Sequence, residues 1–211
     1  MRGHIGPIMS REKGYNPKDR FFHKAKAEGL AARSVYKLQE IDQKFKLLKP
    51  GQTVLDLGSS PGSWSQYASQ KIGASGRLLG IDLSPMTVSL PNAVFIQADL
   101  RDLELESVIR DNGFKPPFDL VISDMMANTT GIKSADQVRS LALCELALDV
   151  AKRFLKPGGN FVCKFFQSGE FGQLRNEIKR TFDRVEALKP ESTRQISKEI
   201  FIIGLKKKTS V

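Results

Sequence analysis

A glycine-bearing loop that follows a short apolar run is the most specific local feature of the sequence. The loop reads DLGSSPGSW, residues 56–64, and leads into a helical pattern. Gly58 and Gly62 permit tight turning and close approach of the backbone, and the amide groups at the start of a helix are free to bind polar ligand atoms. We therefore expect this loop to bind a ligand, with an ordinary strand-to-helix turn as the alternative.

The glycine spacing and the acidic residue of this loop restrict what it could hold. Its G-x-x-x-G spacing is not the G-x-G-x-x-G that brings a pyrophosphate onto a helix N-terminus, and no G-x-x-x-x-G-K-[ST] occurs. A dinucleotide oxidoreductase is thereby disfavoured. Asp56 argues against a phosphate and favours a cationic cofactor. The pattern D-x-G-x-x-P-G resembles the first motif of S-adenosylmethionine-dependent methyltransferases, which predicts S-adenosylmethionine as the cofactor.

Three further aspartates follow successive apolar runs. Asp82 ends the run GID, where a carboxylate can bind both ribose hydroxyls of an adenosine. Asp99, in QADLRD, is placed to accept from an adenine amino group, and Asp124 closes the run VIS. A single aspartate at such a place is often a helix cap or a turn residue. Four at the ends of predicted strands, Asp56 included, favour a ligand site.

Short β-rich runs alternate with longer helical patterns, which predicts an α/β fold with a doubly wound, mostly parallel sheet. The sequence Lys156-Pro157-Gly158-Gly159 predicts a sharp stop after the longest helix. We expect strands at Thr53–Leu57, Arg77–Ile81, Ala93–Gln97, Leu120–Ser123, Asn160–Lys164, Arg184–Ala187 and Glu199–Gly204, and helices at Arg20–Glu28, Ser34–Phe45, Ser63–Lys71, Leu103–Asp111, Ala135–Phe154 and Glu170–Thr181. One domain over residues 20–205 is expected, preceded by a flexible basic segment, 1–19, and followed by a basic tail, 206–211.

Charge is distributed unevenly along the 211 residues, whose net charge is +10. Residues 1–50 hold 12 Lys and Arg against 5 Asp and Glu, residues 51–150 hold 7 against 12, and residues 151–211 hold 14 against 6. Two basic ends around an acidic middle favour a polyanion such as nucleic acid, with a different ligand at the middle. The alternative is that the basic helix faces are only solvated.

Cys144 and Cys163 lie within apolar runs, so we expect both to pack in the core. No run approaches the roughly 20 apolar residues of a membrane helix, and the N-terminus lacks the apolar core of a secretory signal. A cytoplasmic protein is therefore expected.

The order of several motifs resembles one family, the FtsJ/RrmJ type of RNA 2′-O-ribose methyltransferase. The resemblance covers about residues 24–205, and its markers are ARSVYKLQEID, DLGSSPGSWSQ, GIDLSP, ISDMMAN, KPGGNFVCKFFQ and PESTRQISKEIFI. It implies a Rossmann-like sheet of seven strands with the last antiparallel. It also implies a catalytic set of Lys37, Asp124, Lys164 and Glu199. Cofactor contacts are implied at Gly62, Trp64, Asp82, Asp99 and Asp124, beside the Asp56 and Gly58 of the loop.

Two positions depart from the pattern of that family. Ser63 stands where a second glycine is frequent, a change that a negative φ would accommodate. Met126-Ala127 stands where the family often has Ala-Pro, which removes a residue that would stiffen the loop after Asp124.

Methyl transfer to a ribose hydroxyl requires alignment of oxygen, carbon and sulfur, and a group that accepts the proton or stabilises the developing negative charge. No metal is expected. Lys164 interrupts an apolar run at a strand end, where a charge is costly unless it is used. We expect Lys164 to be the proton acceptor or the alkoxide stabiliser, with Asp124 orienting it. A nearby Lys37 favours a neutral amine, whereas Asp124 and Glu199 favour the ammonium form, and the sequence leaves both open.

RNA binding would then fall to the basic ends, at Lys24, Lys26, Arg33, Arg194 and Lys198. Tyr36 either stacks on a base or packs in a partly buried position. The resemblance implies large-subunit ribosomal RNA as substrate, with a uridine as the target, and we expect a monomer that acts on an assembled particle. A transfer RNA substrate is the alternative. A non-catalytic RNA-binding or ribosome-assembly factor is a further one, disfavoured by the intact Lys-Asp-Lys-Glu set.

Overall fold

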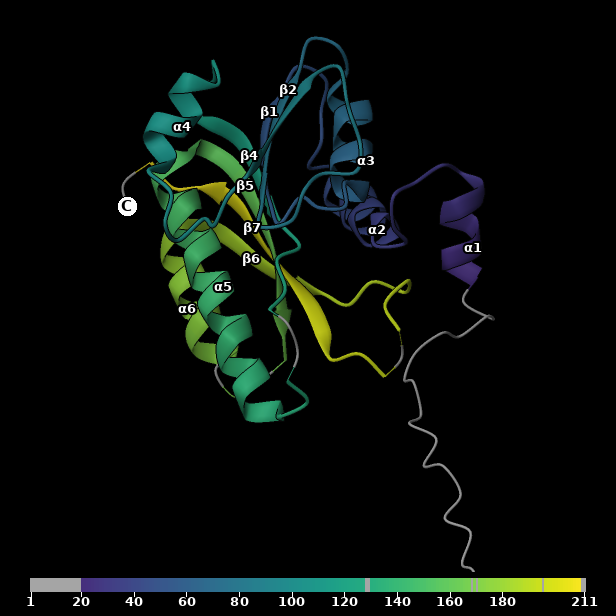
Figure 1. Ribbon diagram of the computed structural model, residues 1–211. Coiled ribbons are helices and arrows are strands. Elements are labelled where there is room, and N and C mark those ends of the chain that lie inside the picture. The colour runs from purple at the N-terminus through teal and green to yellow at the C-terminus, as the bar shows by residue number, and fades with distance from the viewer. Residues whose placement is uncertain (1–19, 128–129, 168, 170, 195, 210–211) are drawn as a thin grey trace, which may run out of the picture.

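The computed structural model describes residues 20–127, 130–167, 169, 171–194 and 196–209. Its centre is a seven-stranded sheet with the order β3-β2-β1-β4-β5-β7-β6 (Figure 1). The strands are β1 Thr53–Leu57, β2 Arg77–Asp82, β3 Ala93–Gln97, β4 Phe118–Ser123, β5 Leu155–Phe166, β6 Phe182–Leu188 and β7 Glu199–Lys207. Strands β1 to β5 pair in parallel, whereas β7 is antiparallel to both β5 and β6. The predicted α/β class and the antiparallel last strand are confirmed.

Helices cover both faces of this sheet (Figure 1). They are α1 Arg20–Ala27, α2 Val35–Phe45, α3 Ser63–Ile72, α4 Leu105–Asp111, α5 Lys133–Phe154 and α6 Phe171–Thr181. One buried apolar cluster includes side chains of α2 and α3, and a second includes side chains of α4, α5 and α6. The sheet is therefore the middle layer of three, and its central strands are buried on both sides.

The apolar face of α2 shows how the sequence positions a helix that matters below. Val35, Leu38 and Ile41 recur at helical spacing and are fully buried, which confirms the predicted amphipathic pattern. Lys37 and Glu40 lie between them and are partly buried. The helix thus packs by one side and presents polar side chains to the neighbouring chain segments.

The predicted end of the longest helix at Phe154 is confirmed, whereas the predicted start of β5 at Asn160 and the predicted end of β7 at Gly204 are wrong. The segment Lys156-Pro157-Gly158-Gly159 lies inside β5 at an irregularity of the pairing. Phe118 pairs with Leu155 and Leu120 with Asn160, so three residues of β4 lie opposite six of β5. The helix α5 ends at Phe154, and the proline and glycines that follow also form an irregularity at the start of the strand.

Strand β7 also continues beyond Gly204, into the residues expected to form a basic tail. The ammonium of Lys207 donates to the carbonyl oxygens of Ala151, Lys152 and Leu155, at 3.3, 2.5 and 2.8 Å. The last carbonyls of a helix have no partner within it, and a cation there satisfies them. Lys207 is therefore a cap of α5.

Cys144 and Cys163 are buried free thiols, as expected. None of the helices in the described part of the chain is long and apolar enough to cross a membrane.

Candidate active site

The register of β5 and β7 places two of the expected catalytic residues on one face of the sheet. Lys164 pairs with Phe201 and Phe166 pairs with Glu199 across these antiparallel strands. Directly opposed residues share a face, and side chains two positions apart on one strand do so as well. Lys164 and Glu199 are therefore diagonal neighbours. Phe201 belongs to the apolar cluster that includes α2 and α3, so this face lies toward α2.

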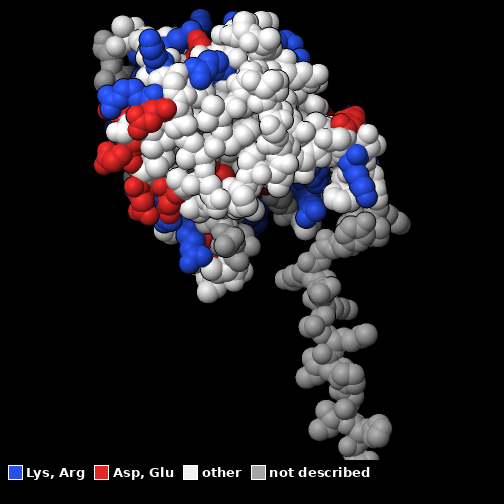
Figure 2. All heavy atoms as spheres, turned by 45° about the horizontal axis from the view of Figure 1, so that its top comes forward, with Lys and Arg blue, Asp and Glu red and all other residues white. Residues whose placement is uncertain are grey.

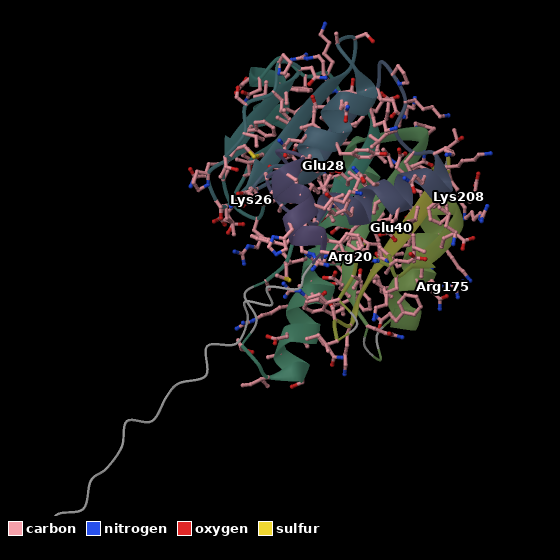
Figure 3. All side chains as sticks on the ribbon, turned by 90° about the vertical axis from the view of Figure 1, so that its right-hand side faces the viewer. Arg20, Lys26, Glu28, Glu40, Arg175 and Lys208 are labelled. Carbon is pink, nitrogen blue, oxygen red and sulfur yellow. The ribbon has the colours of Figure 1, made fainter. Side chains whose placement is uncertain are left out.

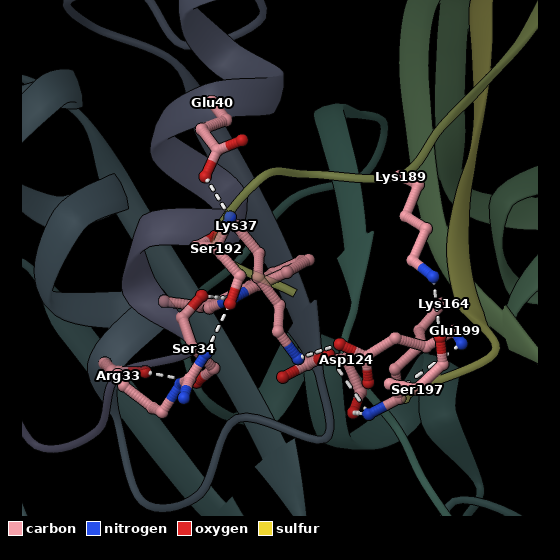
Figure 4. A network of polar contacts seen from close by, with 12 residues as sticks. Arg33, Ser34, Lys37, Glu40, Asp124, Lys164, Lys189, Ser192, Ser197 and Glu199 are labelled. Carbon is pink, nitrogen blue, oxygen red and sulfur yellow. Dashed lines mark hydrogen bonds and ion pairs between the residues drawn. The ribbon is translucent and has the colours of Figure 1, made fainter. Parts of the chain in front are cut away.

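Two ion pairs assemble the set Lys37, Asp124, Lys164 and Glu199 (Figure 4). The Nζ of Lys164 lies 3.0 Å from Asp124 Oδ1 and donates to the carbonyl oxygen of Asp124 at 2.6 Å. Lys37 on α2 forms an ion pair with Glu199 Oε1, and its Nζ also lies 5.9 Å from the centre of the Phe201 ring. The structure thus brings all four residues together, from α2, the end of β4, β5 and the start of β7.

The four charged side chains of this set are largely buried, and burial of a charge costs free energy unless a partner or a ligand compensates it. The side chains of Lys164 and Asp124 are 7% and 17% exposed, and those of Lys37 and Glu199 are 13% and 10% exposed. Asp124 Oδ1 is buried and accepts no hydrogen bond from the described residues, although the Lys164 ammonium contacts it. A partly satisfied, buried charge cluster is typical of a site that binds and transforms a substrate.

A cavity of about 390 Å³ opens beside Asp124, within the range typical of small-molecule sites. Gly58, Asp82 and Asp99 line it, as expected for cofactor-binding residues. Its remaining wall is largely apolar and comes from the loops after β2, β3 and β4 and from α5: Ile81, Leu83, Ser84, Ala98, Leu100, Arg101, Met125, Met126, Ala127, Leu143 and Leu146. The cavity therefore lies at the carboxyl ends of the parallel strands, where open α/β sheets bind ligands.

The glycines of the loop after β1 each have a structural reason. Gly58 has φ +78°, and a Cβ there would lie 2.9 Å from the backbone nitrogen of Met125. Gly62 has φ +117°, and a Cβ would lie 2.3 Å from a methyl carbon of Val88. Both positions combine the left-handed backbone region with close approach to a neighbouring segment, so only glycine fits them without strain.

Asp82 fixes the shape of the same loop. Its two carboxylate oxygens accept from the backbone amides of Ser60 and Ser84, at 2.9 and 2.7 Å. A carboxylate has about four acceptor positions, so lone pairs remain for ligand hydroxyls. Asp82 is therefore both a loop anchor and a member of the cavity wall.

Trp64 has a different place from the one expected for a ligand-contacting side chain. Its indole donates to the carbonyl oxygen of Ser34 at 2.9 Å, and its ring packs on Phe201 with centroids 5.6 Å apart. Trp64 is 3% exposed, and neither it nor the buried Gly62 is among the residues that line the cavity. Ser63 is the first residue of α3, and its hydroxyl lies 2.8 Å from that of Ser34. Its φ is not positive, so the departure from glycine is accommodated.

Asp99 is held by a residue that we did not single out from the sequence. Arg101 binds both carboxylate oxygens, with Nε 2.9 Å from Oδ1 and Nη2 2.5 Å from Oδ2. These hydrogen bonds lower the pKa of Asp99 to about 2. Asp99 is therefore an acceptor-only carboxylate throughout the neutral range, which suits an amino group as its partner.

Asp56 is not among the residues that line the cavity. It is fully buried, its Oδ2 accepts from Ser65 at 2.6 Å, and its Oδ1 has no hydrogen-bond partner among the described residues. Burial, reinforced by the charges of Asp124 and Asp82, raises the pKa of Asp56 to about 7 although the Ser65 hydrogen bond opposes this. An unpartnered carboxylate oxygen at this depth would be stabilised by a nearby cationic ligand.

The five expected RNA-contacting residues divide into exposed and structural ones. Lys26, Arg194 and Lys198 are exposed, and Lys24 is half exposed beside Glu28 at 3.8 Å. Arg33 is partly buried and donates to the carbonyl oxygen of Ser192. Arg20 and Lys26 stand on α1 in Figure 3, and basic side chains also stand where α1 begins in Figure 2.

Tyr36 is 4% exposed and its hydroxyl donates to Glu28 at 2.9 Å, so it packs rather than stacks on a base. Among the described residues, no group of three or more His, Cys, Asp or Glu side chains could hold a metal ion.

Several wall residues were not predicted from the sequence. Arg101 lies only two positions after Asp99, and this spacing is a signal that could have identified it. Leu143 and Leu146 come from the middle of α5 and reach the cavity only through tertiary packing, so the sequence carries no local signal for them.

Comparison with known proteins identifies the family and agrees with the fold. The chain is 68% identical to the ribosomal RNA large subunit methyltransferase E of Bdellovibrio bacteriovorus, over 92% of this chain and 99% of the relative. It is 49% identical to the protein of that name from Desulfatibacillum aliphaticivorans, over 95% and 97%. A Plasmodium falciparum structure assigned as a ribosomal RNA methyltransferase matches with a TM-score of 0.69 and 26% identity, over 84% of this chain and 98% of that one.

The sheet order, the antiparallel β7 and the cavity at the strand ends define the class as a Rossmann-like methyltransferase. Residues 30–207 match the model of one family within that class. The chain belongs to the FtsJ-like methyltransferase family.

Proposed function

We propose that this chain transfers a methyl group from S-adenosylmethionine to a ribose 2′-hydroxyl of large-subunit ribosomal RNA, with a uridine as the target. One observation carries the proposal. The buried Lys164 contacts Asp124 through two oxygens, and the segment after Asp124 lines a cavity that also contains Asp82 and Asp99. A cation is thus held next to a nucleoside-type site, where a reacting oxygen can meet a methyl donor.

The described residues fit the cofactor. Asp82 retains lone pairs for ribose hydroxyls, and the ionised Asp99 can accept from the adenine amino group. Asp56, whose Oδ1 has no hydrogen-bond partner among the described residues and whose pKa is raised to about 7, can ionise when a cationic ligand binds nearby. When bound, S-adenosylmethionine supplies an electrophilic methyl group on a sulfonium.

Lys164 is the residue that acts on the hydroxyl in this proposal. Its two contacts with Asp124 fix the position of Nζ and leave a third direction for the ribose 2′-oxygen. The oxygen–methyl bond forms as the sulfur–methyl bond breaks, and the hydroxyl proton leaves to the amine or to solvent. Lys164 serves as the proton acceptor in its neutral form, or stabilises the alkoxide in its ammonium form. Lys37 and Glu199 position this amine and the ribose.

RNA is the substrate class that the surroundings of the site favour. Both basic ends of the sequence contribute to one side of the molecule, because Arg33 near α2 contacts the loop before β7 that also carries Arg194 and Lys198. Lys24 and Lys26 on α1 extend this basic region. Lysine and arginine side chains bind phosphates without reading sequence. Ribosomal RNA is the choice because the relatives of 68% and 49% identity carry that name.

We further propose that an assembled large-subunit particle supplies part of the recognition. The described chain consists of the methyltransferase sheet, its helices and one short helix before them, without a separate RNA-binding domain within these residues. A protein of this kind gains selectivity from RNA shape, which a particle presents in one conformation.

The test is transfer of labelled methyl from S-adenosylmethionine, with mapping of the labelled ribose. The substrates are large-subunit particles, naked ribosomal RNA and transfer RNA, all from cells that lack the protein. Label on a ribosomal uridine 2′-oxygen, faster on particles than on naked RNA, is the expected result. Label in transfer RNA alone would replace the substrate. No label in any substrate, despite cofactor binding, would favour the non-catalytic assembly factor.

A further inference from the structure

The loop between β6 and β7, residues 189–198, leads directly into Glu199. We call it the β6–β7 loop. Ser192 and Thr193 in this loop are buried, with 1% and 6% exposure. Two backbone hydrogen bonds within the loop shape it. The amide of Thr193 donates to the carbonyl oxygen of Pro190 at 3.0 Å, and the amide of Ser197 donates to that of Arg194 at 2.9 Å. The position of Glu199 therefore depends on how this loop is held.

The side chain of Glu40 on α2 holds the loop from one side (Figure 4). Its Oε2 accepts from the backbone amide of Glu191 at 2.5 Å, and its Oε1 from that of Ser192 at 2.9 Å. Both oxygens of one carboxylate thus bind successive amides, 151 and 152 positions away in the sequence. Charge-assisted hydrogen bonds of this kind are stronger than neutral ones and fix direction as well as distance.

Arg33 holds the same residue from the other side, because its guanidinium donates to the carbonyl oxygen of Ser192. The amide and the carbonyl of Ser192 are therefore both bound to side chains at or next to α2. At the far end of the loop, Lys189 donates to the carbonyl of Ser197 at 2.7 Å, and Ser197 Oγ accepts from the amide of Glu199 at 3.2 Å. These contacts connect Ser192, which Glu40 and Arg33 bind, to Glu199, the first residue of β7.

Glu40 and Lys37 lie three residues apart on α2, hence on neighbouring positions of one helix surface. Lys37 binds the carboxylate of Glu199, while Glu40 binds the loop that delivers Glu199. We propose that Glu40 is a positioning residue, which fixes the β6–β7 loop so that Glu199 meets Lys37 beside Lys164. Glu40 does not touch the reacting atoms. The inference rests on the proposed function, because it assigns Glu40 to the same reaction.

Removal of the carboxylate is expected to slow methyl transfer without weakening cofactor binding, since Glu40 lies outside the cavity wall. We expect Glu40→Ala to lower the single-turnover rate by roughly 10- to 100-fold, the scale for misplacement of a catalytic group. Glu40→Gln retains one acceptor oxygen, so its rate should lie between those of Glu40→Ala and the wild type. Glu177→Ala is the matched control, because Glu177 on α6 pairs with Lys152 on the other face of the sheet.

A double-mutant cycle distinguishes positioning from general loss of structure. The single-turnover rate on the RNA substrate is measured for the wild type, Glu40→Ala, Glu199→Gln and the double variant, at saturating cofactor. If Glu40 acts through Glu199, its removal should change the rate of the Glu199→Gln protein by less than about threefold. Equal fold losses in both backgrounds, or a wild-type rate for Glu40→Ala, would overturn the inference.

The same data separate this inference from the proposed function. A wild-type protein that transfers no methyl group to RNA contradicts the proposed function. A wild-type protein that does so, with Glu199→Gln impaired and Glu40→Ala unimpaired, contradicts only the role of Glu40.

Discussion

Asp56 makes the stability of the fold dependent on pH, in a direction that can be derived from its surroundings. An unperturbed aspartate carboxyl group has a pKa of 3.8, whereas Asp56 in the folded protein has a pKa of about 7. As pH rises from the first value to the second, the unfolded chain releases this proton while the folded protein keeps it. The unfolded state is thereby favoured, so the free energy of unfolding falls through this window and levels off above it.

The size of the effect follows from the gap between the two pKa values. Each pH unit between them is a tenfold change in the proton equilibrium, so the loss from about pH 5 to about pH 8 is about 2–3 kcal/mol. Asp56→Asn is close in shape, cannot ionise, and retains an oxygen for the Ser65 hydroxyl. The stability of the variant relative to the wild type should therefore rise by about 2–3 kcal/mol over the same window.

Urea unfolding of the cofactor-free protein at several pH values measures this difference. Asp183→Asn, on the exposed side of β6, is the matched control, because it removes an exposed carboxylate by the same substitution. If the wild type and Asp56→Asn gave parallel stability profiles from pH 5 to 8, the assignment of a buried, proton-binding Asp56 would be refuted.

Three further variants test other parts of the site. Asp99→Ala should weaken cofactor binding about 10- to 100-fold by calorimetry, because an ionised acceptor is lost. Since the pKa of Asp99 is lowered to about 2, the part of the affinity that depends on Asp99 should stay constant from pH 5 to 9. An unchanged affinity of Asp99→Ala would show that Asp99 does not bind the cofactor. Gly58→Ala should lower the free energy of unfolding by about 2–4 kcal/mol in denaturant titrations, because φ is +78° and the new Cβ meets the backbone of Met125; a neutral effect would contradict this packing. Lys37→Met should cost about 3–5 kcal/mol of unfolding free energy, because Glu199 is left buried without its cation; a loss of activity with unchanged stability would show that the pair is not buried in solution.

The sequence predicts those features that depend on neighbouring residues. The fold class follows from alternating apolar runs, and the aspartates at strand ends follow from the rule that parallel strands meet at one edge. The catalytic set was predicted through the resemblance, and β5 and β7 bring Lys164 and Glu199 together as that set requires. The pairing of two neighbouring strands fixes which of their residues lie side by side, so residues at the ends of paired strands can be placed together from the strand assignment.

Contacts between distant segments could not be predicted from the sequence. Glu40 binds amides about 150 positions away, and no pattern near Glu40 indicates this. Lys207 resembled part of a solvated tail because three lysines occur in a row, yet the unpaired carbonyls at the end of α5 bind it. The indole of Trp64, a residue that the resemblance assigns to the cofactor site, contacts Ser34 and Phe201, and no local pattern predicts these two partners. In each case a tertiary partner outweighs the local signal.

Single-turnover methyl transfer by Lys164→Met tests the central claim most directly. Lys164 is the cation between Asp124 and the expected ribose oxygen, whereas Lys152 on α5 pairs with Glu177 on the other face of the sheet and provides the control, Lys152→Met. The account predicts that Lys164→Met binds the cofactor as the wild type does and transfers methyl about 10²- to 10⁴-fold more slowly. A rate equal to that of the wild type, at saturating cofactor and RNA, would contradict it.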